Sequence, residues 1–212
     1  SIGPAPTALL KHAAALGADE IVAIEAEPLA LDPHAIARVL SAWIDSSGGA
    51  DLILCGRQAS DDDQGVVPAL MAERLGVPLV AVARAVALAD GTGEEPELEV
   101  TRVTPDGDEV VRVRCPAIVT ISNELGEPRF PNTARKLRAR RMKPTVVAID
   151  DLGLGTDALQ PRATVLRQLV PAIQGHCEFL SRDTPAQTAQ LLIARLREDR
   201  LLAPPAEGAR AS

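Results

Sequence analysis

Aromatic side chains are scarce in this chain of 212 residues, which has one Trp, two Phe and no Tyr. Proteins that bind single-stranded nucleic acids stack the bases on aromatic rings, so the scarcity of rings argues against that function. Basic charge is also in deficit, because 22 Lys and Arg stand against 29 Asp and Glu and leave a net charge of −7. We therefore expect no nucleic acid among the partners.

Long apolar runs and clustered cysteines are missing as well. No segment approaches the roughly 18 uninterrupted apolar residues of a membrane span, so we do not expect the chain to be embedded in a membrane. The cysteines Cys55, Cys115 and Cys177 are widely spaced, with no CxxC motif and no His at metal-ligand spacing. Isolated thiols in odd number favour a reducing compartment, so we expect neither a disulfide framework nor a metal site.

What the sequence does contain is an aliphatic α/β pattern. Apolar segments at 20–24, 51–55 and 79–83 alternate with helical patterns over 7–16, from 32 to 46 and over 66–75. Strand–helix–strand units of this kind predict a parallel sheet. The segment 51–55 is almost entirely apolar, which is typical of a strand covered on both faces.

The second of these helices has the clearest signals. Asp32 followed by Pro33 predicts an N-cap and a proline at the first helical position. Apolar side chains then recur at spacings of three and four, which places them on one face that we expect to pack on the core. They are Ile36, Val39, Leu40 and Trp43.

The pattern changes after residue 86. Segments 98–103 and 110–114 alternate apolar and polar residues around a turn at 105–108, which predicts an antiparallel hairpin with one wet face. Periodicity is weak over 156–183, and a capping box at Thr184-Pro185-Ala186-Gln187 starts a last helix. We therefore expect one α/β domain over 1–155, a C-terminal arm with its helix over 156–202 that packs on a partner subunit, and a flexible tail over 203–212.

The loop from Gly56 to Gly65 is the most informative segment, because it follows an apolar strand and leads into a helix. Parallel α/β sheets bind ligands beyond the carboxyl ends of their strands, and the amides of a helix N-terminus suit a phosphate. Two interpretations remain open from pattern alone. The loop is either a phosphate site or a solvated acidic loop in which the run Asp61 to Asp63 stabilises the helix start from outside.

A basic segment over 134–143 carries six Lys and Arg residues in an acidic protein. It is either a docking patch for an acidic partner or a solvated helix face. No catalytic constellation accompanies it, because His12, His34 and His176 lack a Ser or Cys partner in any recognisable motif. A metal-dependent hydrolase using Asp61 to Asp63 is also disfavoured, because adjacent residues rarely converge on one ion. A binding or electron-carrying subunit is therefore favoured over an enzyme.

Several motifs occur together in order: Leu16 to Asp19, the loop Gly56-Arg57-Gln58-Ala59-Ser60-Asp61, the segment Asn123 to Phe130, and Asp151 to Leu154. This succession resembles the electron transfer flavoprotein β subunit family. The resemblance implies an adenine nucleotide α-hydrolase-like α/β fold and pairing with an α subunit that carries most of the FAD site. It also implies an electron carrier, which takes electrons from acyl-CoA or other flavin dehydrogenases and passes them to a quinone reductase.

The resemblance also assigns residues. It places AMP, or a second FAD, on a cofactor-binding loop of Gly56, Arg57, Gln58, Ala59, Ser60, Asp61, Asp62, Asp63, Gln64, Gly65, Val66 and Val67. It places dehydrogenase docking on a second set: Pro131, Asn132, Thr133, Ala134, Arg135, Lys136, Leu137, Arg138, Arg140 and Arg141. It implies a cytoplasmic protein or one of the mitochondrial matrix, with the cytoplasm preferred.

The chain departs from the family pattern at three places. Val66 and Val67 stand where the family usually has Gln or Thr, so only backbone groups there can contact a phosphate. Thr133 aligns with the apolar Leu that anchors the docking loop of many members. The family's N-terminal strand would precede Ser1. An alternative with the same fold is a stand-alone adenine-nucleotide-binding module, regulatory or structural, without a redox role.

Overall fold

The computed structural model describes residues 1–3, 7–26, 31–59, 63–89, 96–167, 169–170, 172, 175 and 177–202. The chain forms two compact units, Ser1–Leu166 and Arg167–Ser212. The predictions that concern Ser60, Asp61, Asp62, His176 and the tail 203–212 lie outside the described residues.

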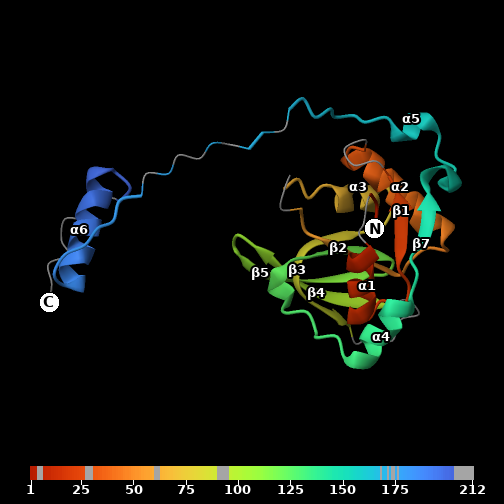
Figure 1. Ribbon diagram of the computed structural model, residues 1–212, viewed down its shortest axis with the longest axis horizontal. Helices are drawn as coiled ribbons and strands as arrows, with labels where there is room; N and C mark the ends of the chain where they lie inside the picture. Colours follow the sequence, from red (N-terminus) through yellow and green to blue (C-terminus); the bar gives the residue numbers. More distant parts are fainter. Residues whose placement is uncertain are drawn as a thin grey trace. The chain divides into compact units, whose positions relative to one another are not determined.

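A five-stranded sheet in the order β2-β6-β3-β4-β5 forms the centre of the first unit (Figure 1). Its strands are β2 (Leu52–Gly56), β3 (Leu79–Leu88), β4 (Glu97–Thr104), β5 (Gly107–Arg114) and β6 (Ala117–Ile121). The pairs β2–β6 and β6–β3 are parallel, whereas β3–β4 and β4–β5 are antiparallel. This confirms the predicted α/β class, with a parallel sheet extended by an antiparallel hairpin.

The hairpin has the expected wet face. Leu98 and Val100 on β4 are buried, while Glu97 and Glu99, which alternate with them, pair across to β5. Glu97 and Arg114 form an ion pair at 3.2 Å, and Glu99 and Arg112 form another at 3.3 Å. Opposite charges directly across an antiparallel pair support its register.

A β-bulge lets β3 serve both halves of the sheet. β3 pairs with β6 up to Ala83 and with β4 from Ala83 onward, with register shifts on both sides. Val82 at the bulge has φ of 60°, and its amide donates a hydrogen bond to the buried Thr120 hydroxyl at 2.8 Å. The Thr120 side chain therefore satisfies a backbone donor beside the bulge.

Helices α2 (Pro33–Ser46) and α3 (Val67–Leu75) cover one face of the sheet. Ala37, Ile44, Met71 and Ala72 from the two helices form a cluster with Ile118 of β6. The Asp32 cap of α2 is confirmed, since its carboxylate accepts the Ala35 amide at 2.8 Å.

The predicted core face of α2 is only partly right. Val39 is fully buried, but Ile36, Leu40 and Trp43 are only half-buried. The helix is buried on two sides: Ala37 and Ile44 belong to the cluster with α3 and β6, and Ala35 and Val39 are buried on a different side of the helix. Leu40 and Trp43 still pack against the cluster with α3 and β6, but each keeps part of its side chain accessible.

The expectation that the 51–55 strand is covered on both faces is wrong. Ile53 and Cys55 of β2 pack toward α2 and α3, but Leu54 on the other face is 56% exposed. β2 is also the edge strand of the five-stranded sheet. An apolar run therefore does not distinguish a strand buried on both faces from an edge strand that helices cover on one face.

A second sheet has two parallel strands, β1 (Val22–Glu25) and β7 (Thr145–Ala148). Beside it, α1 (Thr7–Leu16) packs on α4 (Thr133–Arg141) through Leu10, Ala14, Ala15 and Ala139. Two short 3-10 helices, η1 (Asn123–Leu125) and η2 (Ile149–Leu152), complete the connections.

The first unit continues past residue 155, where the C-terminal arm was expected to begin. The short helix α5 (Thr156–Leu159) contacts α2, and the amides of Arg162 and Ala163 donate to the Asp32 carboxylate. These contacts attach residues 156–163 to the α/β core, and the first unit ends at Leu166.

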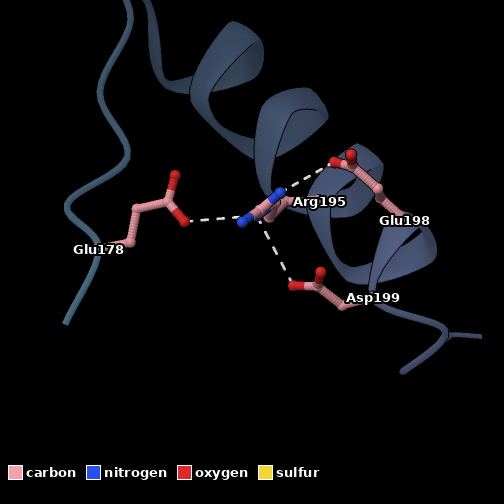
Figure 2. Close-up of polar contacts among 4 residues, drawn as sticks. All are labelled: Glu178, Arg195, Glu198 and Asp199. Carbon is pink, nitrogen blue, oxygen red and sulfur yellow. Dashed lines mark hydrogen bonds and ion pairs between the residues drawn. The ribbon is translucent and has the colours of Figure 1, made fainter. Parts of the chain in front are cut away.

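The second unit holds α6 (Pro185–Glu198), which begins with the predicted capping box between Thr184 and Gln187. Arg195 is surrounded by carboxylates at 3.3 Å from Glu178, 3.0 Å from Glu198 and 3.6 Å from Asp199, as Figure 2 shows. The ion pair with Glu178 connects the segment before α6 to the helix. None of the helices within the described ranges is long and apolar enough to cross a bilayer.

Candidate nucleotide-binding site and docking helix

The candidate site lies where the chain leaves β2. Beyond the end of that strand, the Arg57 amide donates a hydrogen bond to the Ile121 carbonyl at 3.0 Å, which continues the β2–β6 pairing by one bond. The loop therefore starts from a fixed position at the carboxyl ends of two parallel strands. This is the place where α/β sheets bind ligands.

Asp63 closes the loop on itself. Its amide donates to the Ala59 carbonyl at 3.1 Å, and its carboxylate accepts a hydrogen bond from the Gln58 side-chain amide. The carboxylate thus bonds within the loop and does not cap α3, whose N-cap residue Val66 makes no side-chain cap bond. Asp63 is therefore not an N-cap of α3. No group of three His, Cys, Asp or Glu in the described ranges is placed to hold a metal ion.

Gly65, near the end of the loop, packs closely against Arg57 and Gln58 at its beginning. It has φ of +61°, and a Cβ built on it would lie 3.0 Å from the Arg57 carbonyl oxygen and 3.4 Å from the Gln58 Cβ. A larger residue would have to push Gly65 and Arg57 apart. It would also cost conformational energy, because residues with a Cβ disfavour a left-handed backbone. Glycine therefore permits the shape that brings the chain back to the start of α3.

The N-terminus of α3 opens toward this loop without a capping side chain. The first amides of a helix have no acceptor within the helix, and they carry the positive end of its dipole. Pro68 lacks an amide hydrogen, and Val66 and Val67 have apolar side chains. The donors that remain at the helix start are therefore backbone amides. Such a terminus suits an anion such as a phosphate group.

A cavity of about 550 Å³ adjoins the loop and the helix start. One side consists of the loop, and the other is an apolar wall from α2, β2 and α3. The lining residues are Leu31, Pro33, Ile36, Leu40, Trp43, Ile44, Ile53, Leu54, Cys55, Gly56, Arg57, Gln58, Ala59, Gln64, Gly65, Val66, Val67, Pro68 and Met71. An apolar hollow with a few polar groups at one end is the usual form of a small-molecule site.

Most of the predicted cofactor residues meet at this cavity. Gly56 to Ala59 and Gln64 to Val67 line it, and Asp63 shapes the loop without lining it. Sequence reasoning missed the apolar wall. Its signal was the spacing of Ile36, Leu40 and Trp43, which we had interpreted as a core face and which points toward the cavity.

Glu124, Arg57 and Arg84 lie close enough to interact electrostatically near the end of β6. Glu124 follows β6, and the pKa of its carboxyl is lowered by a hydrogen bond from the Ser122 hydroxyl, by its own backbone amide and by the positive charges of Arg57 and Arg84. Of these three charged groups, Arg57 lines the cavity. On the apolar side of the cavity, burial raises the pKa of the Cys55 thiol, which favours its uncharged form.

The predicted docking residues lie on α4 and the segment before it. Asn132 caps the helix by accepting the Arg135 amide at 2.9 Å. Phe130, just before the cap, is 96% exposed. Of the ten predicted docking residues, Pro131 and Arg135 are half-buried and the others are exposed. The structure therefore places them on α4 and the two residues that precede it, mostly exposed.

The model of the electron transfer flavoprotein domain matches residues 1–152 of the chain. Curated β subunits match as well. The chain belongs to the electron transfer flavoprotein β family. This confirms the family that the sequence resembles, and it agrees with the α/β fold described above.

The curated relatives include subunit CarD of the caffeyl-CoA reductase–Etf complex of Acetobacterium woodii, 29% identical over 203 residues that cover 94% of this chain and 76% of that protein. The β subunit of Thermoanaerobacterium thermosaccharolyticum is 33% identical over 75% of this chain and 60% of its own length. The human β subunit is 34% identical over 73% of this chain and 60% of its own length. The chain thus spans about three fifths of the latter two relatives.

Proposed function

We propose that this chain is the β subunit of a heterodimeric electron transfer flavoprotein. In this role it binds AMP, or a second FAD, in the cavity beside β2. It pairs with an α subunit that holds most of the FAD site and receives electrons from acyl-CoA or other flavin dehydrogenases for delivery to a quinone reductase. The single observation that supports the nucleotide site best is the loop 56–65 folded around Gly65 at the mouth of an apolar cavity.

The residues present fit an adenine nucleotide. The uncapped start of α3 offers backbone donors to a phosphate, and Arg57 among the lining residues adds positive charge. The close approach of Gly65 to Arg57 and Gln58 holds the loop beside the start of α3, whose backbone amides would meet the phosphate. Trp43, Leu40 and Ile36 offer an apolar wall for a purine ring.

The electron-carrying chemistry belongs to the flavin, which accepts and donates single electrons when it is bound. The contribution of this chain is to position and to dock. The loop 56–67 holds the nucleotide, the arm packs on the α subunit, and α4 meets the dehydrogenase. We place the protein in a reducing compartment, preferably the cytoplasm, in keeping with its free cysteines.

The test is co-expression of the chain with an α subunit, followed by a visible flavin spectrum and mass spectrometry of the nucleotides released on denaturation. We expect a heterodimer that contains FAD and either AMP or further FAD. Failure to form the heterodimer, with no flavin spectrum, would overturn the proposal.

A matched pair of glycine variants assigns the nucleotide to the loop. Gly65→Ala and Gly76→Ala place an alanine at similar positive φ, +61° and +66°, at the two ends of α3. A Cβ at Gly76 meets nothing within 4 Å, so that variant controls for backbone strain alone. We expect only Gly65→Ala to lose nucleotide. Equal losses in both variants would contradict a site at the loop.

A second candidate function is the stand-alone nucleotide-binding module. It is favoured by Val66 and Val67, which offer no side-chain hydrogen bond to a phosphate. The same nucleotide analysis separates the two candidates. ATP or ADP bound to a homodimer that ignores the α subunit would favour the module.

A further inference from the structure

Three neighbouring strands bring charged side chains together beside the loop that follows β2. The sheet order places β6 between β2 and β3. On the β2 side, the Arg57 amide donates to the Ile121 carbonyl at 3.0 Å. On the β3 side, Ala83 pairs with Ile121, and Arg84 follows directly. The chain then leaves β6 and enters η1, which carries Glu124 and contacts β3. Glu124 therefore follows the strand that lies between those of Arg57 and Arg84.

The Glu124 carboxylate is held back toward the end of β6. It accepts a hydrogen bond from the Ser122 hydroxyl, and this bond, together with the charges of Arg57 and Arg84, lowers the pKa of the carboxyl. Arg84 is already paired, since its guanidinium lies 2.7 Å from the Asp108 carboxylate. None of the ion pairs found among the described residues involves Arg57. Glu124 therefore offsets part of the positive charge that Arg57 brings to the cavity.

The cavity restricts where a ligand can place its charge. The wall opposite the loop consists of apolar side chains from α2, β2 and α3, and a phosphate buried against them would lack partners. A first phosphate is favoured at the backbone amides that start α3. Any further phosphate has to stay on the loop side. There it meets Arg57, but also Glu124 and Asp63, whose carboxylate bonds to the cavity-lining Gln58.

We propose that Glu124 is a specificity-determining residue of the nucleotide site, which favours a nucleotide of low phosphate charge, such as AMP, over ATP. The inference rests on the proposed function, because it names the class of nucleotide that the same cavity accepts. Repulsion between like charges grows with the charge of the ligand, so Glu124 penalises ATP more than AMP. Because Glu124 is exposed, its effect acts through solvent and weakens as salt is added.

The experiment measures the Kd of the full chain for AMP and for ATP by equilibrium dialysis, without divalent cations and after bound nucleotide has been removed. We expect the unaltered chain to bind AMP more tightly than ATP. Glu124→Gln keeps an acceptor for the Ser122 hydroxyl but removes the charge. It should lower the ratio of the ATP Kd to the AMP Kd about threefold or more at about 0.05 M salt. The AMP Kd should change by less than about twofold, and the difference between the ratios should vanish at about 0.5 M salt.

Two matched variants isolate the charge of Glu124. Glu124→Asp keeps the charge and should leave the ratio close to that of the unaltered chain. Asp45→Asn removes an exposed carboxylate about 18 Å along α2 from Pro33, which lines the cavity, and should leave the ratio unchanged. A ratio lowered equally by Asp45→Asn and Glu124→Gln would trace the effect to the net charge of the protein and overturn the inference.

The outcomes separate this inference from the proposed function. If the unaltered chain binds AMP and Glu124→Gln keeps its ratio, the inference alone is overturned. A lower ratio that persists at about 0.5 M salt would also overturn it, because a solvent-screened charge could not be the cause. The same holds if the unaltered chain binds ATP as tightly as AMP, or binds FAD and neither of them. If neither the chain nor its heterodimer binds any adenine nucleotide or FAD, both proposals fail.

Discussion

Asp32 and Arg162 are 130 residues apart in the sequence, yet the Asp32 carboxylate accepts the Arg162 amide at 2.5 Å. The same oxygen accepts the Ala163 amide at 3.1 Å, while the other oxygen caps α2 through the Ala35 amide at 2.8 Å. One buried carboxylate therefore joins the start of a helix to the chain that leads toward the second unit. Its neighbours Leu31 and Pro33 line the cavity, so the junction lies beside the proposed nucleotide site.

Replacing this carboxylate is expected to loosen two segments at once. Asp32→Ala removes a helix cap and leaves two further amides without their acceptor, so the free energy of unfolding should fall by about 2–4 kcal/mol. Hydrogen exchange should accelerate at residues 162 and 163. Urea denaturation and exchange measured by mass spectrometry check both effects. Asp45→Ala, an exposed acidic residue on the same helix, should change neither.

The stability of the first unit should also depend on pH through Asp32. Burial alone would raise the pKa of this carboxyl, but hydrogen bonds from the Ala35, Arg162 and Ala163 amides together outweigh it, with a contribution from His34, and the pKa is lowered. The stabilisation is then complete above the unfolded pKa of about 4 and is lost as the pH falls through the lower folded value. Unfolding curves at stepwise acid pH should show a weaker dependence in Asp32→Asn. An identical dependence in both proteins would contradict this account.

The Thr120 hydroxyl accepts a hydrogen bond from the bulge in β3. Thr120→Val keeps the shape of a buried side chain but removes the acceptor of the Val82 amide. We expect a loss of about 1–3 kcal/mol, because a partly buried donor is left without its partner. Thr101→Val, on the neighbouring strand β4, is the matched control and should be close to neutral. Chemical denaturation of the three proteins decides, and equal stability of Thr120→Val and the unaltered chain would contradict a structural role for the hydroxyl.

The ion pairs of Arg195 should order the segment before α6. Arg195→Gln removes the pair with Glu178 while it leaves the capping box of the helix in place. We expect faster hydrogen exchange near residue 178 and little change in the first turn of α6. High salt should produce the same effect in the unaltered chain, because exposed ion pairs are screened. Unchanged exchange near residue 178 would show that the pairs do not order that segment.

Local signals in the sequence were sufficient for most of the elements. Asp32-Pro33 and the Thr184–Gln187 box start the two helices that they predict, and the turn at 105–108 joins β4 and β5. These features act between residues close in the chain, so no knowledge of the remaining fold is needed to read them. The loop 56–65 stands out for the same reason, because it follows an apolar strand and leads into a helix; that it binds a nucleotide stays a prediction.

Other features depended on what packs against what. The sequence by itself determined that Ile36, Leu40 and Trp43 share a face of α2, and that Leu54 belongs to an apolar strand. Only the tertiary structure decided that this face borders a cavity and that Leu54 is exposed on an edge strand. It likewise decided that Asp32, already a cap by its sequence, holds Arg162 from 130 residues away. Periodicity places side chains on a common face, but the neighbour of that face is set by contacts between segments far apart in the chain.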